Sequence, residues 1–406
     1  MSSASTSRLA QRVLSKLREY DRSKWERILE TMLSRLELSK PQLERAIVAY
    51  GAIARHLAEK LETPLTDVHI IPQGSMRTQT TVRPRGNVKF DLDIVTKLEG
   101  ATIQRMSYDQ LFEAVGLALS TLPESTGKLE RKNRCWRVQM PNEDFYFDVT
   151  PALPDPQRVT GAALKVPDNR RKGWSPSNPV EFAAEFCRVA ALRFQFQAQR
   201  ETSAVFAGKQ VDPLPTERVP LDDILRRTIQ LMKLHRDNFY WQATDRQKDE
   251  QPISVIICTL AMKAYERIWA SRGAEAHSII EVVLAVIDMM PDLIAEERRD
   301  GKYFVRNPAL SSENFADRWN EAGSTRAYEF MRWHGSLEHS VELLLQGEAT
   351  AQNKDALRTV FGEAGVDAFV EAQENSFLGG LLATPAGTVA ANPTRPVPSG
   401  KSHSLA

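Results

Sequence analysis

Two aspartates stand at alternate positions of one short apolar segment. Asp91 and Asp93 alternate with apolar residues in the stretch 88–95, VKFDLDIV, which is typical of a β-strand. Side chains two residues apart in a strand point to the same face, so the two carboxylates would lie side by side. Like charges at this spacing destabilise a fold unless a cation lies between them, and Mg²⁺ prefers carboxylate and phosphate oxygens. The alternative is a solvated strand face, because this spacing of aspartates is common by chance.

A Gly-Ser pair and a third aspartate indicate what these two carboxylates could bind. Gly74-Ser75 follows an earlier short strand, where glycine permits close backbone approach and main-chain amides can cradle a phosphate. Asp148 alternates with aromatic residues in a later strand. Three carboxylates beside a phosphate-binding turn are the groups that two-metal phosphoryl transfer requires. We therefore expect Asp91, Asp93 and Asp148 to hold two Mg²⁺ ions, with Mn²⁺ as the alternative metal.

The elements that must position these residues alternate between strands and helices. Apolar spacing predicts helices at 25–38, 41–60 and 108–122, and strands at 68–71, 88–95, 135–140 and 145–150. The stretch 154–179 is rich in Pro, Asp, Asn, Gly and Arg and is expected to form a long loop. Beyond it, helices are expected at 180–199, 221–239, 252–269 and 276–290.

This order of elements predicts an α+β protein with two lobes. A mixed sheet with helices would pack against a C-terminal helical domain, and the active site would lie in the cleft between them. The expected boundaries are 1–219 for the sheet-containing core with bracing N-terminal helices and 220–380 for the helical domain. Residues 381–406 are expected to form a flexible tail, because they contain few bulky apolar side chains.

Composition narrows the class of protein. The chain has 406 residues, with 53 Lys and Arg against 52 Asp and Glu, and its net charge of +1 argues against a strongly basic nucleic-acid binder. Its three cysteines include no CxxC pair, which argues against a disulfide framework or a cysteine-rich zinc module. We expect a cytoplasmic protein, because the N-terminus has no apolar signal segment and no apolar run is long enough to span a membrane.

The motifs also resemble a known family. Gly-Ser, then Asp-x-Asp, then a distant Asp is similar to the pattern of the DNA polymerase β-like nucleotidyltransferase superfamily. Within it, the chain resembles the bacterial cGAS/DncV-like nucleotidyltransferases, the CD-NTases. The similar segments, between residues 65 and 265, are GSMRTQT at 74–80, FDLDIV at 90–95, FDVTPA at 147–152, WSPSNP at 174–179 and QPISVII at 251–257. Gln79 departs from the pattern, because many relatives have glycine before this threonine.

The resemblance implies an enzyme that joins NTPs, with release of pyrophosphate, into a cyclic oligonucleotide second messenger. The product would be a cyclic di- or trinucleotide, with adenine as the favoured base, and would act on a downstream effector in anti-phage (CBASS) signalling. Asp91 and Asp93 would bind both metal ions, while Asp148 would complete one site and assist deprotonation of the attacking hydroxyl. Gly74 and Ser75 would contact the donor triphosphate.

Two residues of the expected helical domain match a further part of the family pattern. Relatives hold the phosphates with a lysine and a serine, to which Lys233 and Ser254 correspond. Each has an alternative: Lys233 would otherwise be a surface charge on an amphipathic helix, and Ser254 a helix cap after Pro252. We also expect a monomer with no membrane contact and no stable nucleic-acid partner.

The C-terminus raises one further expectation. Some CD-NTases are joined through this end to a target by ubiquitin-transferase-like partners, and the chain ends in Ser-Leu-Ala with Ala406 last. The alternative is an unselected tail.

Two other functions are compatible with the sequence. One is a nucleotidyltransferase that tails RNA or transfers AMP to a protein or small molecule, although the near-zero net charge gives little sign of RNA binding. The other is a non-catalytic nucleotide-binding regulator, against which the three aspartates and Gly74-Ser75 weigh.

Overall fold

The computed structural model of this chain describes residues 7–370, except 19–21, 24, 27–28, 30–31, 34–35, 84–87, 124–128, 158–160, 197–218, 220–222, 273–274, 277, 347–354, 359, 364–365 and 368. The α-helices are α1 (Arg8–Leu14), α3 (Lys40–Lys60), α4 (Gly74–Thr78), α5 (Tyr108–Leu119), α6 (Pro179–Ala190), α7 (Ile224–Phe239), α8 (Asp245–Glu250), α9 (Ser254–Arg272), α10 (Ile279–Glu297) and α11 (Arg326–Gln346). The strands are β1 (Val68–Pro72), β2 (Phe90–Leu98), β3 (Leu129–Arg131), β4 (Trp136–Gln139), β5 (Phe145–Pro154), β6 (Leu164–Asp168), β7 (Gly173–Ser177), β8 (Gln195–Phe196), β9 (Glu275–Ala276), β10 (Arg306–Asn307) and β11 (Leu310–Asn314). Three short 3₁₀ turns are η1 (Leu65–Asp67), η2 (Ile103–Arg105) and η3 (Asp317–Asn320).

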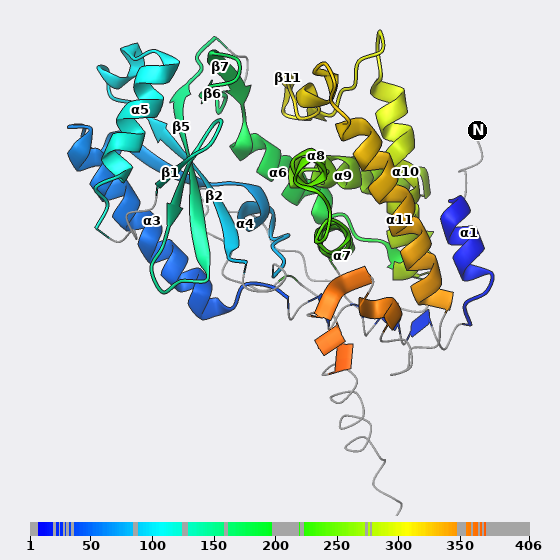
Figure 1. The fold of residues 1–406 in the computed structure, drawn as a ribbon. Coiled ribbons are helices and arrows are strands. Elements are labelled where there is room, and N and C mark those ends of the chain that lie inside the picture. The colour runs from blue at the N-terminus through cyan, green and yellow to red at the C-terminus, as the bar shows by residue number, and fades with distance from the viewer. Residues whose placement is uncertain are drawn as a thin grey trace, which may run out of the picture.

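A mixed sheet forms the first lobe (Figure 1). Its strands run in the order β1-β2-β5-β4-β3, and β6 pairs with the far end of β5 and with β7. Only β2 and β5 among these neighbours are parallel. Parallel strands need a crossover connection, and α5 lies in the segment that joins them. The expected α+β class with a mixed sheet is confirmed.

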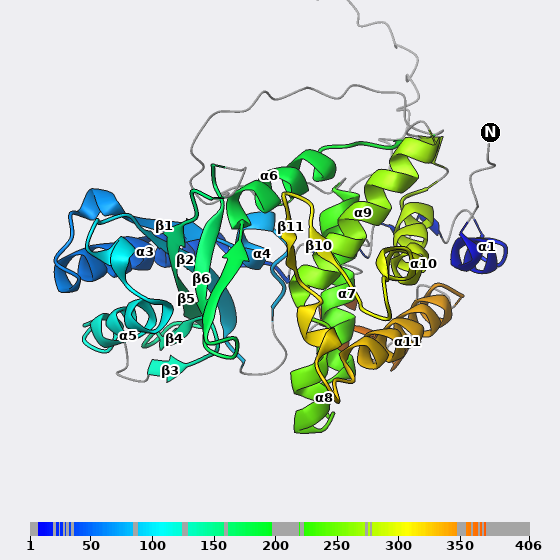
Figure 2. The same ribbon diagram turned by 90° about the horizontal axis from the view of Figure 1, so that it is seen from above.

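Helices α3 and α5 cover the face of the sheet that points away from the other lobe (Figures 1 and 2). Strands β2 and β5 supply the core beneath them, because every second side chain of a strand points to the same face. The buried side chains from these two strands are Phe90, Leu92, Ile94, Phe145, Phe147 and Val149. The intervening positions point to the opposite face, where the two lobes meet.

Helix α7 forms the centre of the second, helical lobe. Every residue from Ile224 to His235 is buried, because α9, α10 and α11 pack around it and the sheet lobe lies beside it. The N-terminal segment joins this core: buried apolar residues between Leu9 and Leu36 belong to the same cluster as those of α7 and α10. The domain boundaries expected from the sequence stay a prediction.

One face of α7 holds the two lobes together. Arg226, Gln230 and Lys233 lie four and three residues apart, so their side chains share a face. They donate hydrogen bonds to main-chain carbonyl oxygens within 78–81, at 2.8, 3.3 and 2.8 Å. The segment that follows α4 is therefore fixed by side chains of the helical lobe.

The stretch 154–179 is not the long loop that its composition predicts. Strands β6 and β7 form an antiparallel hairpin there. Leu164 and Val166 bury their side chains in a small cluster with residues of β2 and β5, which favours a strand despite the polar surroundings. Pro176 is tolerated because β7 lies at the edge of the sheet.

Two helix ends also differ from expectation. Helix α6 ends at Ala190, and α10 continues through Pro291 to Glu297. Burial of Leu293 and Ile294 in the helical core offsets the hydrogen bond that a proline removes from a helix. Neither this extended helix nor another in the described part of the chain combines the length and apolar character needed to cross a bilayer.

Replacing Arg226 by Gln should lower the free energy of unfolding by about 3–5 kcal/mol, because the substitution leaves the buried carboxylate of Asp223 without its ion-pair partner. Arg188→Gln is the matched control: its pairs with Glu185 and Glu266 are solvent-exposed and contribute about 0–1 kcal/mol each. Urea denaturation measures both. Equal losses would contradict the stabilising effect assigned to the buried Arg226–Asp223 pair.

Candidate active site

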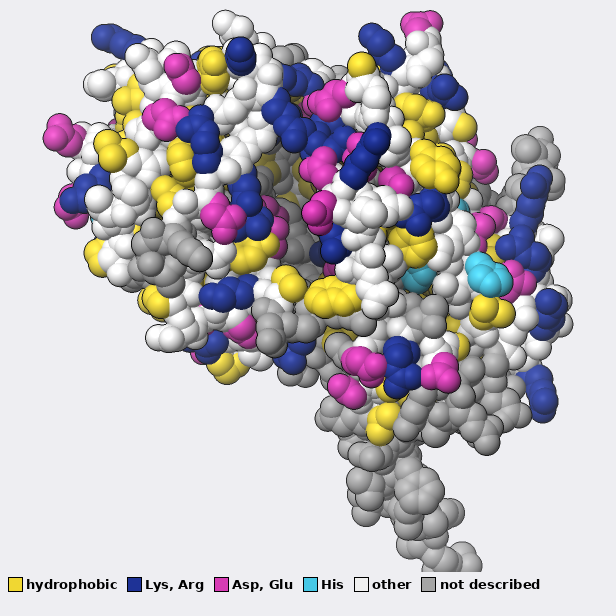
Figure 3. All heavy atoms as spheres, viewed as in Figure 1, with side chains coloured by type: hydrophobic (Ala, Val, Ile, Leu, Met, Phe, Trp, Pro, Cys, Tyr) yellow, Lys and Arg dark blue, Asp and Glu magenta, His cyan; other side chains and the backbone are white. Residues whose placement is uncertain are grey.

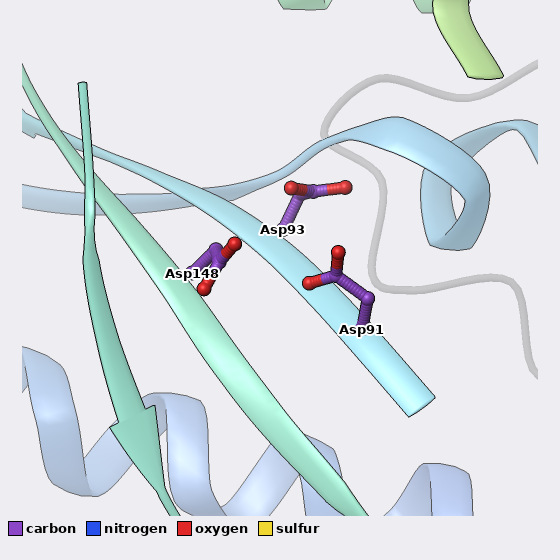
Figure 4. A group of neighbouring side chains, drawn as sticks. All are labelled: Asp91, Asp93 and Asp148. Carbon is purple, nitrogen blue, oxygen red and sulfur yellow. The ribbon is translucent and has the colours of Figure 1, made fainter. Parts of the chain in front are cut away.

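The three aspartates predicted from the sequence come together in the structure. Asp91 and Asp93 lie on β2 and Asp148 on β5, and the parallel register places Asp93 opposite Asp148. One carboxylate oxygen from each residue lies within 4.8 Å of the others. Figure 4 shows the three carboxyl groups around a common space. Clustered carboxylate oxygens are the ligands that hard divalent cations prefer, so these residues fit the expected metal ions.

A glycine is required beside this triad. Gly74 opens α4 with φ of +59°, in the left-handed region that favours glycine. A Cβ atom at this position would lie 2.4 Å from Oδ2 of Asp93, closer than any real contact. The absence of a side chain therefore allows the start of α4, including Ser75, to lie against the acidic strand. Gly74 and Ser75 both line the cavity described below.

Gln79, which departs from the family pattern, forms a tight turn after α4. It ends α4 in the left-handed region, with φ of 55° and ψ of 38°. The next residue, Thr80, then donates its main-chain N–H to the carbonyl oxygen of Ser75 at 2.9 Å. The left-handed conformation costs a non-glycine residue roughly 1 kcal/mol, but it does not prevent the turn from forming.

Ionisation of Asp91 and Asp93 is unfavourable in this site. Withdrawal from bulk water, followed by the charge of Asp148, raises the pKa of Asp91 to about 6. The same withdrawal, followed by the charges of Asp91 and Asp148, raises the pKa of Asp93 well above its usual value. Arg137 and Lys233 lower both values without cancelling the effect. The surplus negative charge is what a bound divalent cation would neutralise.

Arg137 was not singled out from the sequence. It lies on β4 opposite Asp148, and its Nε and Nη2 donate to the two carboxylate oxygens of Asp148 at 2.8 Å each. Tyr146 is the neighbour of Asp91 in the strand register, and it lowers the pKa of that carboxyl group. The available signal was alternation: Arg137 precedes the buried Val138, so it points to the same face as the aspartates.

Lys233 lies inside the protein and not on a solvated helix face. It is 5% exposed, lines the cavity, and donates from Nζ to the main-chain oxygen of Thr80. Burial lowers its pKa below the ordinary value for lysine. Its charge still acts on Asp91 and Asp93, whose pKa values it lowers. The structure therefore brings Lys233 to the site.

Ser254 also lines the cavity, at the first residue of α9. Its hydroxyl oxygen accepts a hydrogen bond from Nη1 of Arg236 at 3.0 Å. The same nitrogen of Arg236 donates to the carbonyl oxygen of Pro252. Arg236 lines the cavity one helical turn after Lys233 and was not singled out from the sequence.

A cavity of about 1290 Å³ separates the sheet lobe from the helical lobe. It exceeds the volume of about 300–1,000 Å³ that is typical of a small-molecule site, so it offers room for more than one ligand of that size. Figure 3 shows basic and acidic side chains interspersed where the lobes face each other. Arg134 and Arg171 of the sheet lobe form ion pairs there with Asp317 of the helical lobe.

Comparison with known proteins identifies the family that this chain resembles. Residues 24–189 match the family model described as the Second Messenger Oligonucleotide or Dinucleotide Synthetase domain, SMODS. A curated relative, the c-di-GMP synthase of Roseivirga ehrenbergii, is 25% identical over 355 residues, which cover 85% of each chain.

Solved structures share the fold. The CD-NTase CdnG of Bradyrhizobium diazoefficiens, in complex with GTP, matches with a TM-score of 0.62 and 22% identity over 86% of this chain and 99% of its own. CdnC of Escherichia coli MS115-1, with ATP, matches with a TM-score of 0.54 and 13% identity over 82% and 97%. The resemblance to the CD-NTases is confirmed, together with the bilobed α+β fold and the expected class of enzyme, a nucleotidyltransferase.

Replacing Gly74 by Ala should weaken Mn²⁺ binding by the cation-free protein at least tenfold, because the new Cβ displaces the carboxylate of Asp93. Gly301→Ala is the matched control: Gly301 also has a positive φ, but a Cβ there meets no atom within 4 Å. The control should lose about 1 kcal/mol of stability and keep the native Mn²⁺ affinity. Parallel losses of affinity in both variants would contradict the steric explanation.

Affinity for divalent cations should rise with pH through about 6, because Asp91 must lose its proton before it binds a cation. Stability of the cation-free protein should change in the opposite sense. A carboxyl group with a raised pKa in the folded state favours folding while it is protonated, so stability falls as the pH rises from about 4 to above 6. Thermal denaturation across this range, with and without Mn²⁺, measures both trends. A cation affinity independent of pH between 5 and 7 would contradict the assignment.

Proposed function

We propose that this nucleotidyltransferase joins NTPs into a cyclic dinucleotide second messenger, with release of one pyrophosphate for each bond formed. The observation that carries the proposal is the acidic triad on β2 and β5, which faces a cavity shared with Lys233 of the helical lobe. The SMODS match and the curated relative, a c-di-GMP synthase, support the same reaction.

The chemistry requires a ribose hydroxyl oxygen to attack the α-phosphorus of a second NTP while the bond to pyrophosphate breaks. Two divalent cations, Mg²⁺ in this proposal, supply charge that activates the hydroxyl and stabilises the leaving oxygen. Asp91 and Asp93 would hold both ions, and Asp148 would complete one site and assist removal of the hydroxyl proton. No covalent bond to the protein is needed, so catalysis relies on positioning and on charge.

The residues around the triad would position the donor triphosphate. Main-chain amides at Gly74 and Ser75 lie where α4 meets the acidic strand, and Lys233 brings a buried positive charge to the same cavity. Ser254 would contribute a hydroxyl from the helical lobe, held in place by Arg236. Both lobes would therefore contact one substrate.

Ring closure requires a second reaction at the same site. After the first bond forms, the linear dinucleotide must turn so that its free hydroxyl meets its own triphosphate. The size of the cavity supports this step, because two nucleotides must lie in it together. A cyclic trinucleotide is the alternative product.

The nucleobase of the product is either adenine or guanine. The resemblance of the sequence favours adenine, whereas the curated relative, a c-di-GMP synthase, favours guanine. Mass spectrometry of the products made from all four NTPs distinguishes these purines. It also distinguishes a cyclic dinucleotide from a trinucleotide.

The biological setting is proposed from the resemblance alone. The product would act in the cytoplasm on a downstream effector during anti-phage (CBASS) signalling. Conjugation of the C-terminus by a ubiquitin-transferase-like partner remains a prediction, and Ala406 lies outside the described residues.

One experiment separates the proposed function from its rivals. The protein is incubated with labelled NTPs and Mg²⁺, without any acceptor. Small phosphatase-resistant products support cyclic nucleotide synthesis. Labelling that depends on added RNA, protein or small molecule would instead indicate a tailing or AMP-transferring enzyme, and the absence of turnover would indicate a nucleotide-binding regulator.

Replacing both Asp91 and Asp93 by Asn should abolish product formation, because both metal ions would lose their shared ligands. The melting temperature of the cation-free protein should rise slightly, since the substitution removes repulsion between carboxylates. Asp109→Asn is the matched control, on the exposed start of α5 outside the cavity, and should keep normal activity. Product formation by the double variant at a near-native rate would overturn the proposal.

A further inference from the structure

Arg137 brings a positive charge into direct contact with the acidic triad. Its guanidinium binds Asp148 through two hydrogen bonds of 2.8 Å, one to each carboxylate oxygen. The same Nη2 lies 4.0 Å from Oδ2 of Asp91. The charge of one arginine is therefore shared between two of the three proposed metal ligands.

The surroundings hold this arginine in place. Its guanidinium carbon lies 4.0 Å from the centre of the Tyr146 ring, a distance at which a cation is attracted to the aromatic face. Tyr146 is also the neighbour of Asp91 in the strand register, so the arginine, the tyrosine and the two aspartates lie together. The Arg137 side chain is only 22% exposed, and an ordered side chain of this kind loses little further freedom on holding its partner.

We propose that Arg137 is a positioning residue with two separable effects on the reaction. Its two guanidinium hydrogen bonds fix the orientation of the Asp148 carboxylate. The proposed mechanism needs this carboxylate beside the attacking hydroxyl. Its charge neutralises part of the triad, which limits how tightly the site binds a divalent cation. This inference rests on the proposed metal-dependent function and deepens it.

The two effects have opposite consequences when the arginine is removed. Loss of the positive charge leaves three carboxylates to attract a cation, so affinity should increase. Loss of the two hydrogen bonds frees the Asp148 carboxylate to rotate, so turnover should decrease. A residue that acted only on the stability of the fold would lower both quantities together, and the opposite signs are therefore diagnostic.

The test compares Arg137→Gln with the native protein. Mn²⁺ affinity is measured without nucleotide by electron paramagnetic resonance, and kcat by pyrophosphate release at saturating NTP and metal. We expect Arg137→Gln to bind Mn²⁺ on the order of tenfold more tightly, as removal of a nearby unit charge implies. Its kcat should fall at least tenfold. Weaker or unchanged Mn²⁺ binding, or an unchanged kcat, would overturn the inference.

A second substitution separates charge from geometry. Arg137→Lys keeps the positive charge but cannot form the two parallel bonds, so it should retain native Mn²⁺ affinity and lose kcat. If Arg137→Gln does not fold, the lysine variant alone decides, and native kcat in it would overturn the inference. Arg131→Gln is the control for charge, because Arg131 lies on β3 against Phe112 and Trp136 and outside the cavity. It should change neither quantity.

Failure of this inference can be told apart from failure of the proposed function. If the native protein binds Mn²⁺ and makes the cyclic product, but Arg137→Gln does not show the opposed changes, only the role of Arg137 is wrong. If replacing both Asp91 and Asp93 by Asn leaves Mn²⁺ binding and turnover intact, the proposed site itself is wrong.

Discussion

The parallel pairing of β2 with β5 is the constraint on which the site depends. Their register sets Asp93 beside Asp148, and the pleat sends the intervening apolar residues to the opposite face, where α3 and α5 cover them. The same alternation therefore builds the core and gathers the acidic side chains. A slip of one residue in either strand would bury aspartates and expose aromatic rings such as Phe147, so the pairing is strongly specified.

Three crowded carboxylates make the site unfavourable in the absence of a cation, and its neighbours limit the cost. Arg137 supplies a positive charge, and Gly74 leaves the space that the Asp93 carboxylate occupies. Lys233 adds a second charge but is itself buried, which shows that the helical lobe also bears part of the cost. Functional sites commonly contain such locally unfavourable arrangements, and the two large hydrophobic cores on either side allow them here.

Short-range patterns were enough to predict the strands, the mixed sheet and the three aspartates, because alternation and spacing are local properties. Features that depend on distant partners were missed. Arg137 meets Asp148 across a strand pair whose register no local pattern reveals. The burial of Lys233 depends on a carbonyl oxygen 153 residues earlier in the chain. The β6–β7 hairpin was missed because its composition is that of a loop, and Leu164 and Val166 are the only buried aliphatic residues in its two strands.

The face of α7 that binds the segment 78–81 has a consequence for the way in which the cleft works. Three side chains of α7 donate hydrogen bonds to the backbone of residues 78–81. Separation of the lobes at this contact must therefore break all three bonds. The cavity between the lobes is then a chamber that is fixed on one side by this contact. Under the proposed function, a linear intermediate turns inside that chamber, and the volume of the chamber limits the length of the intermediate that can turn. The room available for the turn, and not a chemical preference, would set the largest ring that the enzyme can close.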